Sequence, residues 1–445
     1  MRLKTFKIGG THPPECKFSE RAAIEELALP TRAVFPLGQS LGAPPVPVVQ
    51  KGDAVKVGQM IAKGEAFISS NIHSSVSGKV VAIDDCIDAS GYKRPAIIIE
   101  VEGDEWDASI DRSPDLKRTI HAEKEEIIAI IKEHGIVGMG GAAFPSHVKL
   151  MIPEGKKCEA LIINAVECEP YLTSDHRLML EKGEELLVGV KILMRAVEVK
   201  KAYIGIENNK PDAIAHLTEL AKGYDGIEVV PLKVKYPQGA EKQLIQAIVN
   251  REVPCGKLPI EVGVVVVNVG TAVAVYEAVQ KNKPLIQRVV TVTGKSLAKP
   301  SNFYVRIGTP TFMLIEAAGG LPDDYGKLVS GGPMMGKAVT SLDIPITKGT
   351  SGILLMTRKE SKRIPVQNCI RCAKCTTICC MGLEPYLLSN LATCNDFEQL
   401  EGEGVMNCIE CGSCQYICPS GRPLLDMIRT GKGQVGKIIK NRNVK

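Results

Sequence analysis

The sequence predicts a multidomain protein of mixed α/β and α+β character, with a β domain at its N-terminal end and a helical, cysteine-rich module at its C-terminal end. Three observations predict this organisation. Short strand-like runs with Gly-Asp turns fill residues 46–99, strand-like and helix-like patterns alternate over residues 113–280, and cysteines recur at fixed spacing between Cys369 and Cys418. The expected domains span residues 1–112, 113–284, 285–361 and 362–445.

The composition is that of a globular chain with ordinary hydrophobic cores. A net charge of +5 over 445 residues is too small for a dedicated nucleic-acid-binding protein. The longest apolar run, Val262–Val279, is interrupted by Gly263, Asn268 and Glu277, so it predicts a buried strand, a turn and a helix rather than a membrane span. We expect no transmembrane segment and no export signal.

Residues 1–112 predict a compact β unit after a Pro- and Gly-rich segment that contains Gly-Gly-Thr-His-Pro-Pro at residues 9–14. The pattern Gly-Asp-x-Val-x-x-Gly-Gln at residues 52–59 resembles the hammerhead, or barrel-sandwich, fold of biotinyl and lipoyl domains. Those domains present a modifiable lysine on a hairpin, whereas the matching hairpin here reads Ser-Asn-Ile-His at residues 70–73. The resemblance therefore implies a scaffold and not a swinging-arm carrier.

Residues 113–284 predict an α/β domain with a largely parallel sheet. After a polar connector, a helix is expected over residues 120–134, with Gly135 ending it. The strands expected after it are Ala160–Ala165, Lys201–Ile206, Ile227–Leu232 and Gly263–Val267, and the helices expected are Ser174–Val197, Pro211–Lys222, Ala240–Asn250 and Thr271–Lys281.

Residues 285–361 predict a small α+β unit that resembles the β-grasp module called SLBB. Strands are expected at Val289–Thr293 and Phe303–Val305, and a short helix should begin at Thr309-Pro310 and end at Gly319-Gly320. The turn-rich run Gly-Gly-Pro-Met-Met-Gly at residues 331–336 is expected to be a linker packed on the core.

The C-terminal module repeats the spacing C-x2-C-x2-C-x3-C, first over residues 369–379 and then over residues 408–418. This spacing is typical of ferredoxins with two [4Fe–4S] clusters, in which three close cysteines bind one cluster and the fourth binds the other. Structural zinc would leave one cysteine of each triplet unused, and disulfides need an oxidising compartment. The expected ligand sets are Cys369, Cys372, Cys375 and Cys418 for one cluster, and Cys408, Cys411, Cys414 and Cys379 for the other.

Some features of this module lie outside the repeated spacing. Cys380 stands where the second motif has Pro419, so it competes with Cys379 as the crossing ligand. Cys394 is expected to be a spare thiol, and residues 384–391 have helical spacing. The basic tail, residues 432–445, is expected to be disordered.

A glycine-rich stretch, Gly138 to Lys149, is the second run that indicates chemistry. Glycines let backbone N–H groups approach a phosphate or a flat ring. The run also fits the dinucleotide pattern G-x-G-x-x-A, but a helix precedes it where that fingerprint follows a strand. Farther on, Asn-Ala-Val-Glu-Cys-Glu-Pro at residues 164–170 ends a strand, at the edge where α/β sheets bind ligands. From the residues alone, a ligand site and a solvated turn are equally good interpretations of that loop.

Taken in order, these motifs resemble the NADH-binding, FMN-carrying subunit of respiratory complex I. The similarity continues through Tyr-Pro-Gln-Gly-Ala-Glu at residues 236–241 and Asn-Val-Gly-Thr at residues 268–271. With the N-terminal segment, the hammerhead, the SLBB unit and the two cysteine motifs, nearly the whole chain resembles the C subunit of the Rnf complexes. Members of that family are peripheral subunits of membrane-bound ferredoxin:NAD⁺ oxidoreductases, which couple electron flow to Na⁺ or H⁺ transport.

The resemblance implies a set of cofactor-binding residues, which we group by the part of the ligand that each would contact. The FMN phosphate and ribityl chain would lie against Gly138, Gly140, Gly141 and Lys149, and the flavin against Asn164, Asn268 and Thr271. Phe144 would stack on adenine, and Glu169 and Glu241 would contact NAD(H). The set is completed by Glu167, Tyr236 and Gly239. Val166 and Ala240 replace acidic residues of complex I, so polar contacts to the flavin should differ.

The implied chemistry joins a two-electron carrier to one-electron carriers. Nicotinamides exchange a hydride and each cluster takes one electron, so FMN must stand between NAD(H) and the two [4Fe–4S] clusters. Hydride passes between the cofactors themselves, and no catalytic side chain is expected. The implied partners are the other Rnf subunits, NAD(H) and, through the complex, ferredoxin. The implied location is the cytoplasmic face of the bacterial inner membrane.

Two alternative functions are kept. The cobalamin reductase of propanediol-utilising bacteria has similar flavin, SLBB and cluster parts, but here residues 9–14 and the hammerhead precede the flavin motif. A non-enzymatic iron–sulfur carrier or scaffold subunit, with a purely structural glycine loop, is the alternative from another class.

Overall fold

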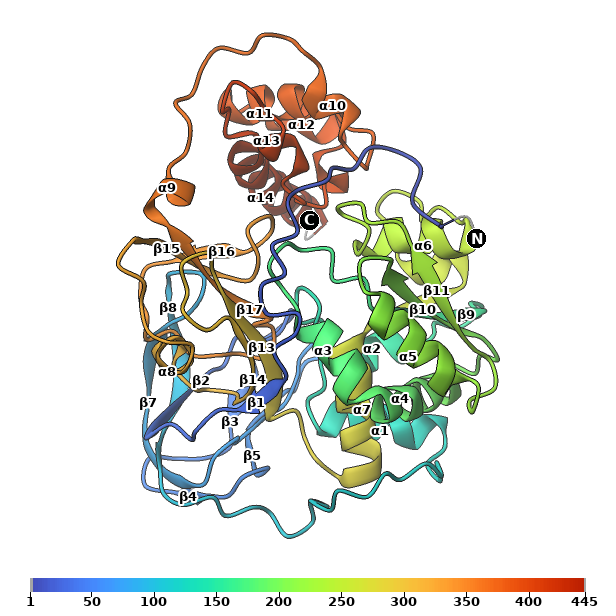
Figure 1. The fold of residues 1–445 in the computed structure, drawn as a ribbon, viewed down its shortest axis with the longest axis vertical. Coiled ribbons are helices and arrows are strands. Elements are labelled where there is room, and N and C mark those ends of the chain that lie inside the picture. The colour runs from blue at the N-terminus through green and yellow to red at the C-terminus, as the bar shows by residue number, and fades with distance from the viewer. Residues whose placement is uncertain (1–2, 444–445) are drawn as a thin grey trace.

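The computed structural model describes residues 3–443, whose strands form four sheets, with a helical module at the C-terminal end (Figure 1). In that view the sheets lie in the lower part of the molecule and the helical module lies above them. Among the helices of residues 3–443, none combines the length and the apolar character needed to cross a membrane.

The N-terminal β domain consists of two small sheets, with strand orders β2-β8-β7-β4 and β3-β5-β6. Side chains of these strands, such as Phe35, Ile61 and Ile99, are fully buried and belong to one hydrophobic core. The hairpin at residues 70–73 is also buried, and Asn71 Nδ2 donates to Glu133 O (3.0 Å), so this hairpin packs on the α/β domain. The strands are β2 (Arg32–Pro36), β3 (Val46–Pro47), β4 (Ala54–Val55), β5 (Met60–Lys63), β6 (Ile72–His73), β7 (Gly78–Ile87) and β8 (Lys93–Val101).

The α/β domain has a four-stranded parallel sheet of order β11-β10-β9-β12, as the alternating pattern predicted. Asn268, at the end of β12, is in register with Asn164, at the end of β9, so both amides lie at the carboxyl edge of the sheet. The strands are β9 (Ala160–Asn164), β10 (Ala202–Glu207), β11 (Ile227–Leu232) and β12 (Val264–Asn268). The helices are α1 (Lys124–Glu133), α2 (Ser146–Leu150), α3 (Ser174–Glu181), α4 (Gly183–Ala196), α5 (Pro211–Ala221), α6 (Glu241–Val249), η1 (Pro259–Val262) and α7 (Val269–Lys281).

The single helix predicted over residues 174–197 is wrong, because the chain forms two helices there. α3 ends at Glu181 and α4 begins at Gly183, since Lys182 leaves the helical conformation (φ −128°, ψ 31°). Gly183 packs closely at the break, where an added Cβ would lie 2.8 Å from Leu220 Cδ1. Tertiary packing therefore interrupts a segment whose side-chain pattern is continuous.

A six-stranded sheet of order β1-β14-β13-β17-β15-β16 forms the SLBB-like unit. Its edge strand β1 comes from the N-terminal segment and pairs in parallel with β14, so segments far apart in the sequence are joined in one sheet. The strands are β1 (Ile24–Glu26), β13 (Gln287–Thr293), β14 (Ser301–Arg306), β15 (Tyr325–Ser330), β16 (Lys337–Val339) and β17 (Gly352–Thr357), with helices α8 (Thr311–Ala317) and α9 (Arg358–Ser361).

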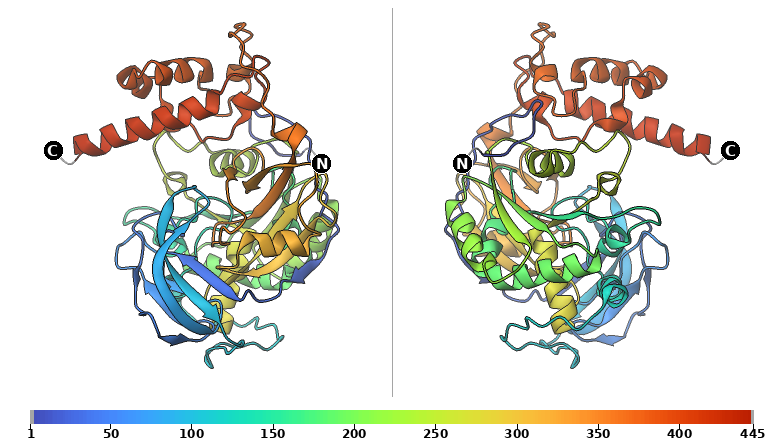
Figure 2. Two further views of the ribbon diagram at one scale, coloured as in Figure 1. Left: turned by 90° about the vertical axis from the view of Figure 1, so that its left-hand side faces the viewer. Right: turned by 90° about the vertical axis from the view of Figure 1, so that its right-hand side faces the viewer.

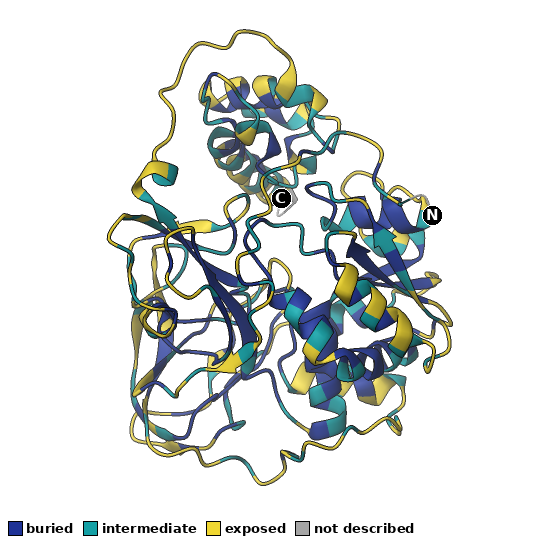
Figure 3. Cartoon of the chain, in the orientation of Figure 1, coloured by how far each residue is buried: buried dark blue, intermediate teal, exposed yellow. Residues whose placement is uncertain are grey.

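The helical module contains α10 (Lys374–Thr377), α11 (Pro385–Thr393), α12 (Phe397–Gly402), η2 (Val405–Asn407), α13 (Ser413–Tyr416) and α14 (Leu424–Asn443). The loop that leads into it, residues 362–373, is exposed throughout (Figure 3). The disorder predicted for the tail is wrong as far as Asn443, because α14 continues through it (Figure 2). Val435 is fully buried and Arg442 pairs with Glu401, so packing orders a segment whose composition is polar. Residues 444–445 lie outside the described residues.

Candidate functional site

The glycine-rich loop, residues 138–145, connects α1 with α2 and is closed at its base. Val137 and Pro145 form an antiparallel bridge, and Gly138 N donates to Phe144 O (2.8 Å). The tip, residues 140–142, is exposed. Such a tip, almost without side chains, leaves backbone N–H groups accessible to a phosphate or a ring.

The loop rests on the carboxyl edge of the parallel sheet, beside the start of α7. Thr271 Oγ1 accepts a hydrogen bond from Met139 N (2.9 Å) and donates to Val137 O (3.2 Å). Gly140 lies so close to Asn268 that an added Cβ would be 2.8 Å from Asn268 Nδ2. The structure therefore brings Gly140, Asn268 and Thr271 together.

The Asn268 amide is fixed on both sides. Its Oδ1 accepts from Gly270 N (2.8 Å), which caps α7, and its Nδ2 donates to Asp175 Oδ2 (2.6 Å). Burial, followed by the charge of Glu167, raises the pKa of Asp175 to about 7. A carboxyl group at this depth orients the amide beneath the loop and titrates near neutral pH.

A buried arginine supports the loop from the six-stranded sheet. Arg288 lies on β13, where its Nη2 donates to Met139 O (3.4 Å) and its Nη1 donates to Lys348 O (2.5 Å). Burial lowers the pKa of Arg288 to about 10, and Asp175 is the charge that opposes this shift. The SLBB-like unit thus supplies one of the groups that hold the glycine loop.

The segment before α6 lies against the loop that follows β9. Asn164 Nδ2 donates to Gly239 O (2.7 Å), and Gly239 N donates to Cys168 Sγ (3.3 Å). At the rim, Lys149 Nζ donates to Glu241 Oε1 (2.7 Å) and to Val266 O (3.0 Å). Two residues predicted to bind different cofactors, Lys149 and Glu241, are therefore an ion pair.

Glu167 is turned toward a helix and not toward the glycine loop. Its Oε1 accepts from Asp175 N (2.8 Å) and its Oε2 accepts from His176 N (3.1 Å), so the carboxylate caps the first turn of α3. Nearby, Lys17 Nζ donates to the carbonyl oxygens of Glu167, Glu169 and Leu172 at 2.7–3.0 Å. This lysine, from the N-terminal segment, fixes the loop that carries both glutamates.

Glu169 and Tyr236 contact other parts of the chain. Glu169 Oε1 accepts from Met334 N (2.6 Å) and Met335 N (3.0 Å) of the loop between β15 and β16. The Tyr236 hydroxyl donates to Cys411 O (2.7 Å) in the cysteine module. Phe144, at the end of the glycine loop, is half-buried. The predicted nucleotide side of the site is thus bordered by the SLBB-like unit and by the cysteine module.

The two cysteine-rich segments, residues 369–382 and 408–421, have matching backbone geometry. Each donates the N–H of the residue two positions after its first cysteine to that cysteine's Sγ, at 3.4 Å. Each also donates the N–H of a glycine to the carbonyl oxygen of its fourth cysteine, at 3.2 Å. Left-handed residues fall at the same places in both segments, at Arg371, Ala373 and Gly382 in the first and at Glu410, Gly412 and Gly421 in the second. The repeat in sequence is therefore a repeat in structure.

The second set of cysteines lines one apolar cavity. The cysteines that face it are Cys379, Cys380, Cys408, Cys411 and Cys414. The first set is more open, since Cys369 and Cys372 are exposed, although Gln367 N donates to Ser420 O (2.9 Å) and so holds the two ends of that set side by side. Within residues 3–443, no group of three or more His, Cys, Asp or Glu side chains has the arrangement of a metal site.

Three family models match the chain. The model described as the Nuo51 FMN-binding domain matches residues 131–277, the RnfC barrel sandwich hybrid domain matches residues 4–104, and the SLBB domain matches residues 289–338. These ranges confirm the predicted barrel-sandwich domain, the α/β domain of the FMN-binding type and the SLBB module.

Known relatives cover almost the whole chain. It is 47% identical to the C subunit of the proton-translocating ferredoxin:NAD⁺ oxidoreductase complex of Clostridium ljungdahlii, over 90% of this chain and 87% of the relative. It is 43% identical to the C subunit of the Na⁺-translocating complex of Acetobacterium woodii, over 97% of each chain. It is 42% identical to the C subunit of the ion-translocating oxidoreductase complex of Rhodobacter capsulatus, over 98% of this chain and 84% of the relative. The chain belongs to the Rnf C subunit family.

Membership of the Rnf C family confirms the resemblance that the ordered motifs indicated. Among solved structures, the NAD⁺-reducing [NiFe]-hydrogenase in its H₂-reduced state is similar in fold, with a TM-score of 0.51 and 20% identity over 70% of this chain and 63% of that chain. The air-oxidised state of the same enzyme gives a TM-score of 0.50. At this identity the likeness concerns the fold alone.

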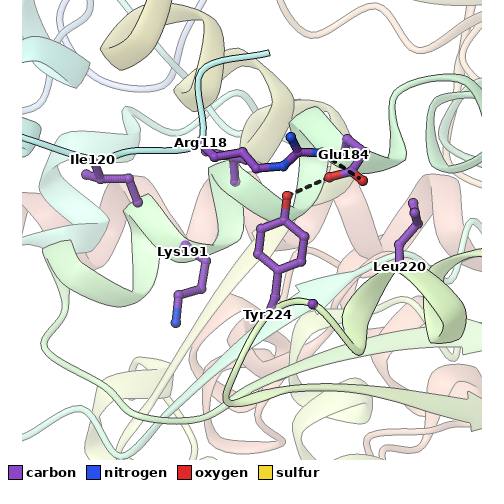
Figure 4. Close-up of a pocket in the computed structure, with 8 residues that line it drawn as sticks. Arg118, Ile120, Glu184, Lys191, Leu220 and Tyr224 are labelled. Carbon is purple, nitrogen blue, oxygen red and sulfur yellow. Dashed lines mark hydrogen bonds and ion pairs between the residues drawn. The ribbon is translucent and has the colours of Figure 1, made fainter.

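Figure 4 shows a cavity of about 390 Å³ on the α/β domain of this Rnf C subunit, and none of the predicted site residues lines it. Glu184 pairs there with Arg118 (3.3 Å) and accepts from the Tyr224 hydroxyl (2.6 Å). The lining comes from α4, from the end of α5 and the residues just after it, and from the connector before α1. The cavity is therefore lined by residues other than those of the site at the glycine loop.

Sequence reasoning missed several groups around the glycine loop: Lys17, Asp175, Arg288 and the loop at residues 331–336. Asp175 has the sequence position of an ordinary first-turn acidic residue, so no motif distinguishes it. Arg288 gave a usable signal, because it is an arginine next to a strand-like apolar run that was expected to be buried. The loop at residues 331–336 was expected to pack on the core, and the sequence did not indicate its contact with Glu169.

Proposed function

We propose that this Rnf C subunit exchanges a hydride between NAD(H) and FMN at the glycine loop and passes single electrons to two [4Fe–4S] clusters in its C-terminal module. It does so as an electron-transfer subunit of an ion-translocating ferredoxin:NAD⁺ oxidoreductase complex. One observation carries the proposal: the loop that borders the glycine-loop site contains Tyr236, whose hydroxyl donates a hydrogen bond to Cys411 O of the cysteine module. A flavin-type site and a cluster-type site are therefore in direct contact.

FMN fits the residues at the carboxyl edge of the sheet. Backbone N–H groups at Gly140 and Gly141 would hold its phosphate and ribityl chain, with Lys149 at the rim as the cation. Gly138 would lie beside them, with its own N–H donated to Phe144 O (2.8 Å). Asn164, Asn268 and Thr271 would contact the ring system, and Asp175 keeps the Asn268 amide in one orientation. FMN, when bound, converts hydride transfer into single-electron transfer. The protein's own role is to bind, orient and shield it, and no side chain acts as an acid or a base.

NAD(H) would lie on the side of the site that is bordered by Phe144, Tyr236 and Glu241. An aromatic ring such as Phe144 provides a surface for adenine, and a carboxylate such as Glu169 accepts hydrogen bonds from ribose hydroxyl groups. Glu167 would act at one remove, because its carboxylate caps α3 and so fixes the loop that carries Glu169. Gly239 keeps this segment close to the loop that carries Glu169, since an added Cβ would be 3.1 Å from Cys168 Sγ.

The repeated cysteine segments would hold two [4Fe–4S] clusters, on backbone that has the same geometry in both. Thiolates that accept backbone N–H hydrogen bonds are the usual ligands of such clusters, and both segments present the same N–H to sulfur contact. Cys379 is favoured over Cys380 as the crossing ligand. Its carbonyl oxygen accepts from Gly382 N as that of Cys418 accepts from Gly421 N, and its Sγ accepts from Leu383 N (3.4 Å), so Cys379 is the residue that corresponds to Cys418. One cluster would be bound by Cys369, Cys372, Cys375 and Cys418. The other would be bound by Cys408, Cys411, Cys414 and Cys379.

The partners are the other subunits of the complex, as the names of the relatives state for their own complexes. Ferredoxin is reached through those subunits. We infer a peripheral position at the membrane that holds the complex, on its cytoplasmic face.

The test is anaerobic reconstitution of the full chain, with iron, sulfide and flavin measured per chain, followed by titration with NADH. We expect about eight irons and one FMN per chain and bleaching of the flavin by NADH. Lys149→Ala should lower FMN occupancy and leave cluster absorbance unchanged. The matched control is Lys156→Ala, which removes a comparably exposed lysine paired with Glu261. Protein that holds clusters but neither FMN nor an NADH response is a non-enzymatic carrier.

A further inference from the structure

The loop between β15 and β16, residues 331–336, is held against the α/β domain by one carboxylate. Glu169 Oε1 accepts hydrogen bonds from two consecutive N–H groups, Met334 N at 2.6 Å and Met335 N at 3.0 Å. Gly332 packs on the same side chain so closely that an added Cβ would lie 2.0 Å from Glu169 Cγ. The loop is therefore fitted to Glu169 both by hydrogen bonds and by shape.

This contact occupies the group through which a nucleotide would be recognised. A carboxylate binds ribose through hydroxyl donors, and backbone N–H groups are donors to the same oxygen atoms. Desolvation raises the pKa of Glu169, so the carboxylate depends on its remaining donors for stabilisation. The two N–H groups of the loop hold Oε1, so a nucleotide whose ribose hydroxyl groups take both oxygens of that carboxylate has to replace them.

The loop is bonded to the sheet at its first residue, where Gly331 N donates to Gly352 O (2.7 Å). It joins β15 to β16, and β16 is a strand of three residues at the edge of the six-stranded sheet. An edge strand this short contributes few hydrogen bonds, so the loop can be displaced without opening the sheet. On its other side the loop touches the cysteine module, since an added Cβ at Gly412 would lie 2.7 Å from Met334 O.

We propose that the loop at residues 331–336 is a gate over the nucleotide side of the site. Glu169 holds the gate closed through the N–H groups of Met334 and Met335. NAD(H) opens the gate by replacing these N–H groups as hydrogen-bond donors to the carboxylate. This inference rests on the proposed function, because it takes NAD(H) as a ligand of Glu169. The gate belongs to the SLBB module, so that module takes part in nucleotide binding. The contact with Gly412 makes the turn after Cys411 sensitive to whether the gate is open.

Amide hydrogen exchange on the reconstituted full chain, with and without NAD⁺, tests the gate directly. NAD⁺ should speed exchange at Met334 and Met335 by roughly tenfold or more, because their acceptor is lost. Unchanged or slower exchange at these two amides overturns the gate.

A variant gives a second test that does not alter Glu169. Gly332→Ala should prevent the loop from closing, so exchange at Met334 should be fast without NAD⁺. Reduction of the flavin by limiting NADH should also be several-fold faster. In the wild type most molecules are closed and only the open minority binds NADH, whereas in the variant the loop is open throughout. The matched control is Gly433→Ala on α14, where an added Cβ meets nothing within 4 Å. Gly332→Ala that behaves like this control in both measurements overturns the gate.

The two proposals fail in different ways. Protein that binds FMN but is not bleached by NADH contradicts the proposed function, whatever its amide exchange. Protein that is bleached normally while Met334 and Met335 stay protected contradicts the gate alone.

Discussion

The hydroxyl group of Tyr236 donates a hydrogen bond of 2.7 Å to the backbone carbonyl oxygen of Cys411. Tyr236 is almost fully buried and is also held through its backbone, which exchanges two hydrogen bonds with Thr11 at 2.7 and 2.8 Å. Burial raises the pKa of this phenol, so it stays a donor at every physiological pH. One side chain thus joins the loop at the nucleotide side of the site to the turn that presents a cluster ligand.

Tyr236→Phe removes this bond while keeping the ring. A hydrogen bond of this kind contributes roughly 1 kcal/mol, so the chain should still fold and bind both kinds of cofactor. We expect an altered EPR signal for the cluster that contains Cys411 and slower transfer of electrons from flavin to cluster. Tyr386→Phe is the control, because the Tyr386 hydroxyl bonds only to Glu384 within the module. Identical EPR spectra for the two variants would contradict the prediction.

Two neighbouring glycines should differ when each is changed to alanine. At Gly140 the new Cβ would meet Asn268 Nδ2 at 2.8 Å, whereas at Gly141 it would meet nothing within 4 Å. Gly140→Ala should therefore lower both the melting temperature of the cofactor-free protein and its FMN affinity. Overpacking of this kind lowers the free energy of unfolding by about 1–3 kcal/mol. Gly141→Ala should lower FMN affinity alone, if the flavin lies over that position. Thermal unfolding and flavin titration of both variants give the comparison, and equal melting temperatures would count against the close packing of Gly140 on Asn268.

Stability should depend on pH through Asp175. Its pKa is raised from 3.8 to about 7, so between these values the folded protein keeps a proton that the unfolded chain has lost. The sign follows directly: this group's contribution to stability is largest at low pH and is lost as pH rises through about 7. Asp175→Asn removes the ionisation and keeps an acceptor for Asn268, so its melting temperature should rise relative to wild type between pH 5 and pH 8. Asp343→Asn, an exposed site, is the control, and a constant difference for Asp175→Asn across this range would refute the assignment.

The crossing ligand can be identified from iron content. Cys379→Ser should lower iron by up to about four atoms per chain, because one cluster loses a ligand, whereas Cys380→Ser should keep both clusters. Cys394→Ser is the matched control, since Cys394 is exposed and lies between the two motifs. Loss of iron in Cys380→Ser but not in Cys379→Ser would reverse the assignment.

Much of the fold could be predicted because its signals are local. Alternating strand and helix patterns predicted every strand of the parallel sheet to within a residue or two, and Gly135 follows α1 with a positive φ of 62°. The repeated cysteine spacing predicted two equivalent segments, and their left-handed residues do coincide. The order of motifs indicated the family, which the relatives confirm.

What could not be predicted depends on contacts between distant parts of the chain. Nothing near Lys182 indicates that Leu220 will crowd Gly183 and divide a helix. The composition of the tail predicted disorder, and the order of α14 comes from burial of Val435 against the module. Likewise, Lys149 pairs with Glu241, and Glu169 accepts a hydrogen bond from Met334 N. Both contacts join residues that are far apart in the sequence, so no local pattern indicates them. Sequence motifs therefore locate the site, and tertiary contacts determine which of its side chains are already engaged.

The N-terminal segment has a consequence for how this protein can be divided. Strand β1 completes the sheet that contains β14, Thr11 bridges to Tyr236, and Gly10 N donates to Ile378 O (2.9 Å) beside the cysteines. About two dozen residues at the start of the chain thus act as a strap that fastens three later units to one another. Fragments cut at the domain boundaries would each lose a contact with this N-terminal segment. A circularly permuted chain that starts after residue 112 would need a linker long enough for the same segment to reach all three units.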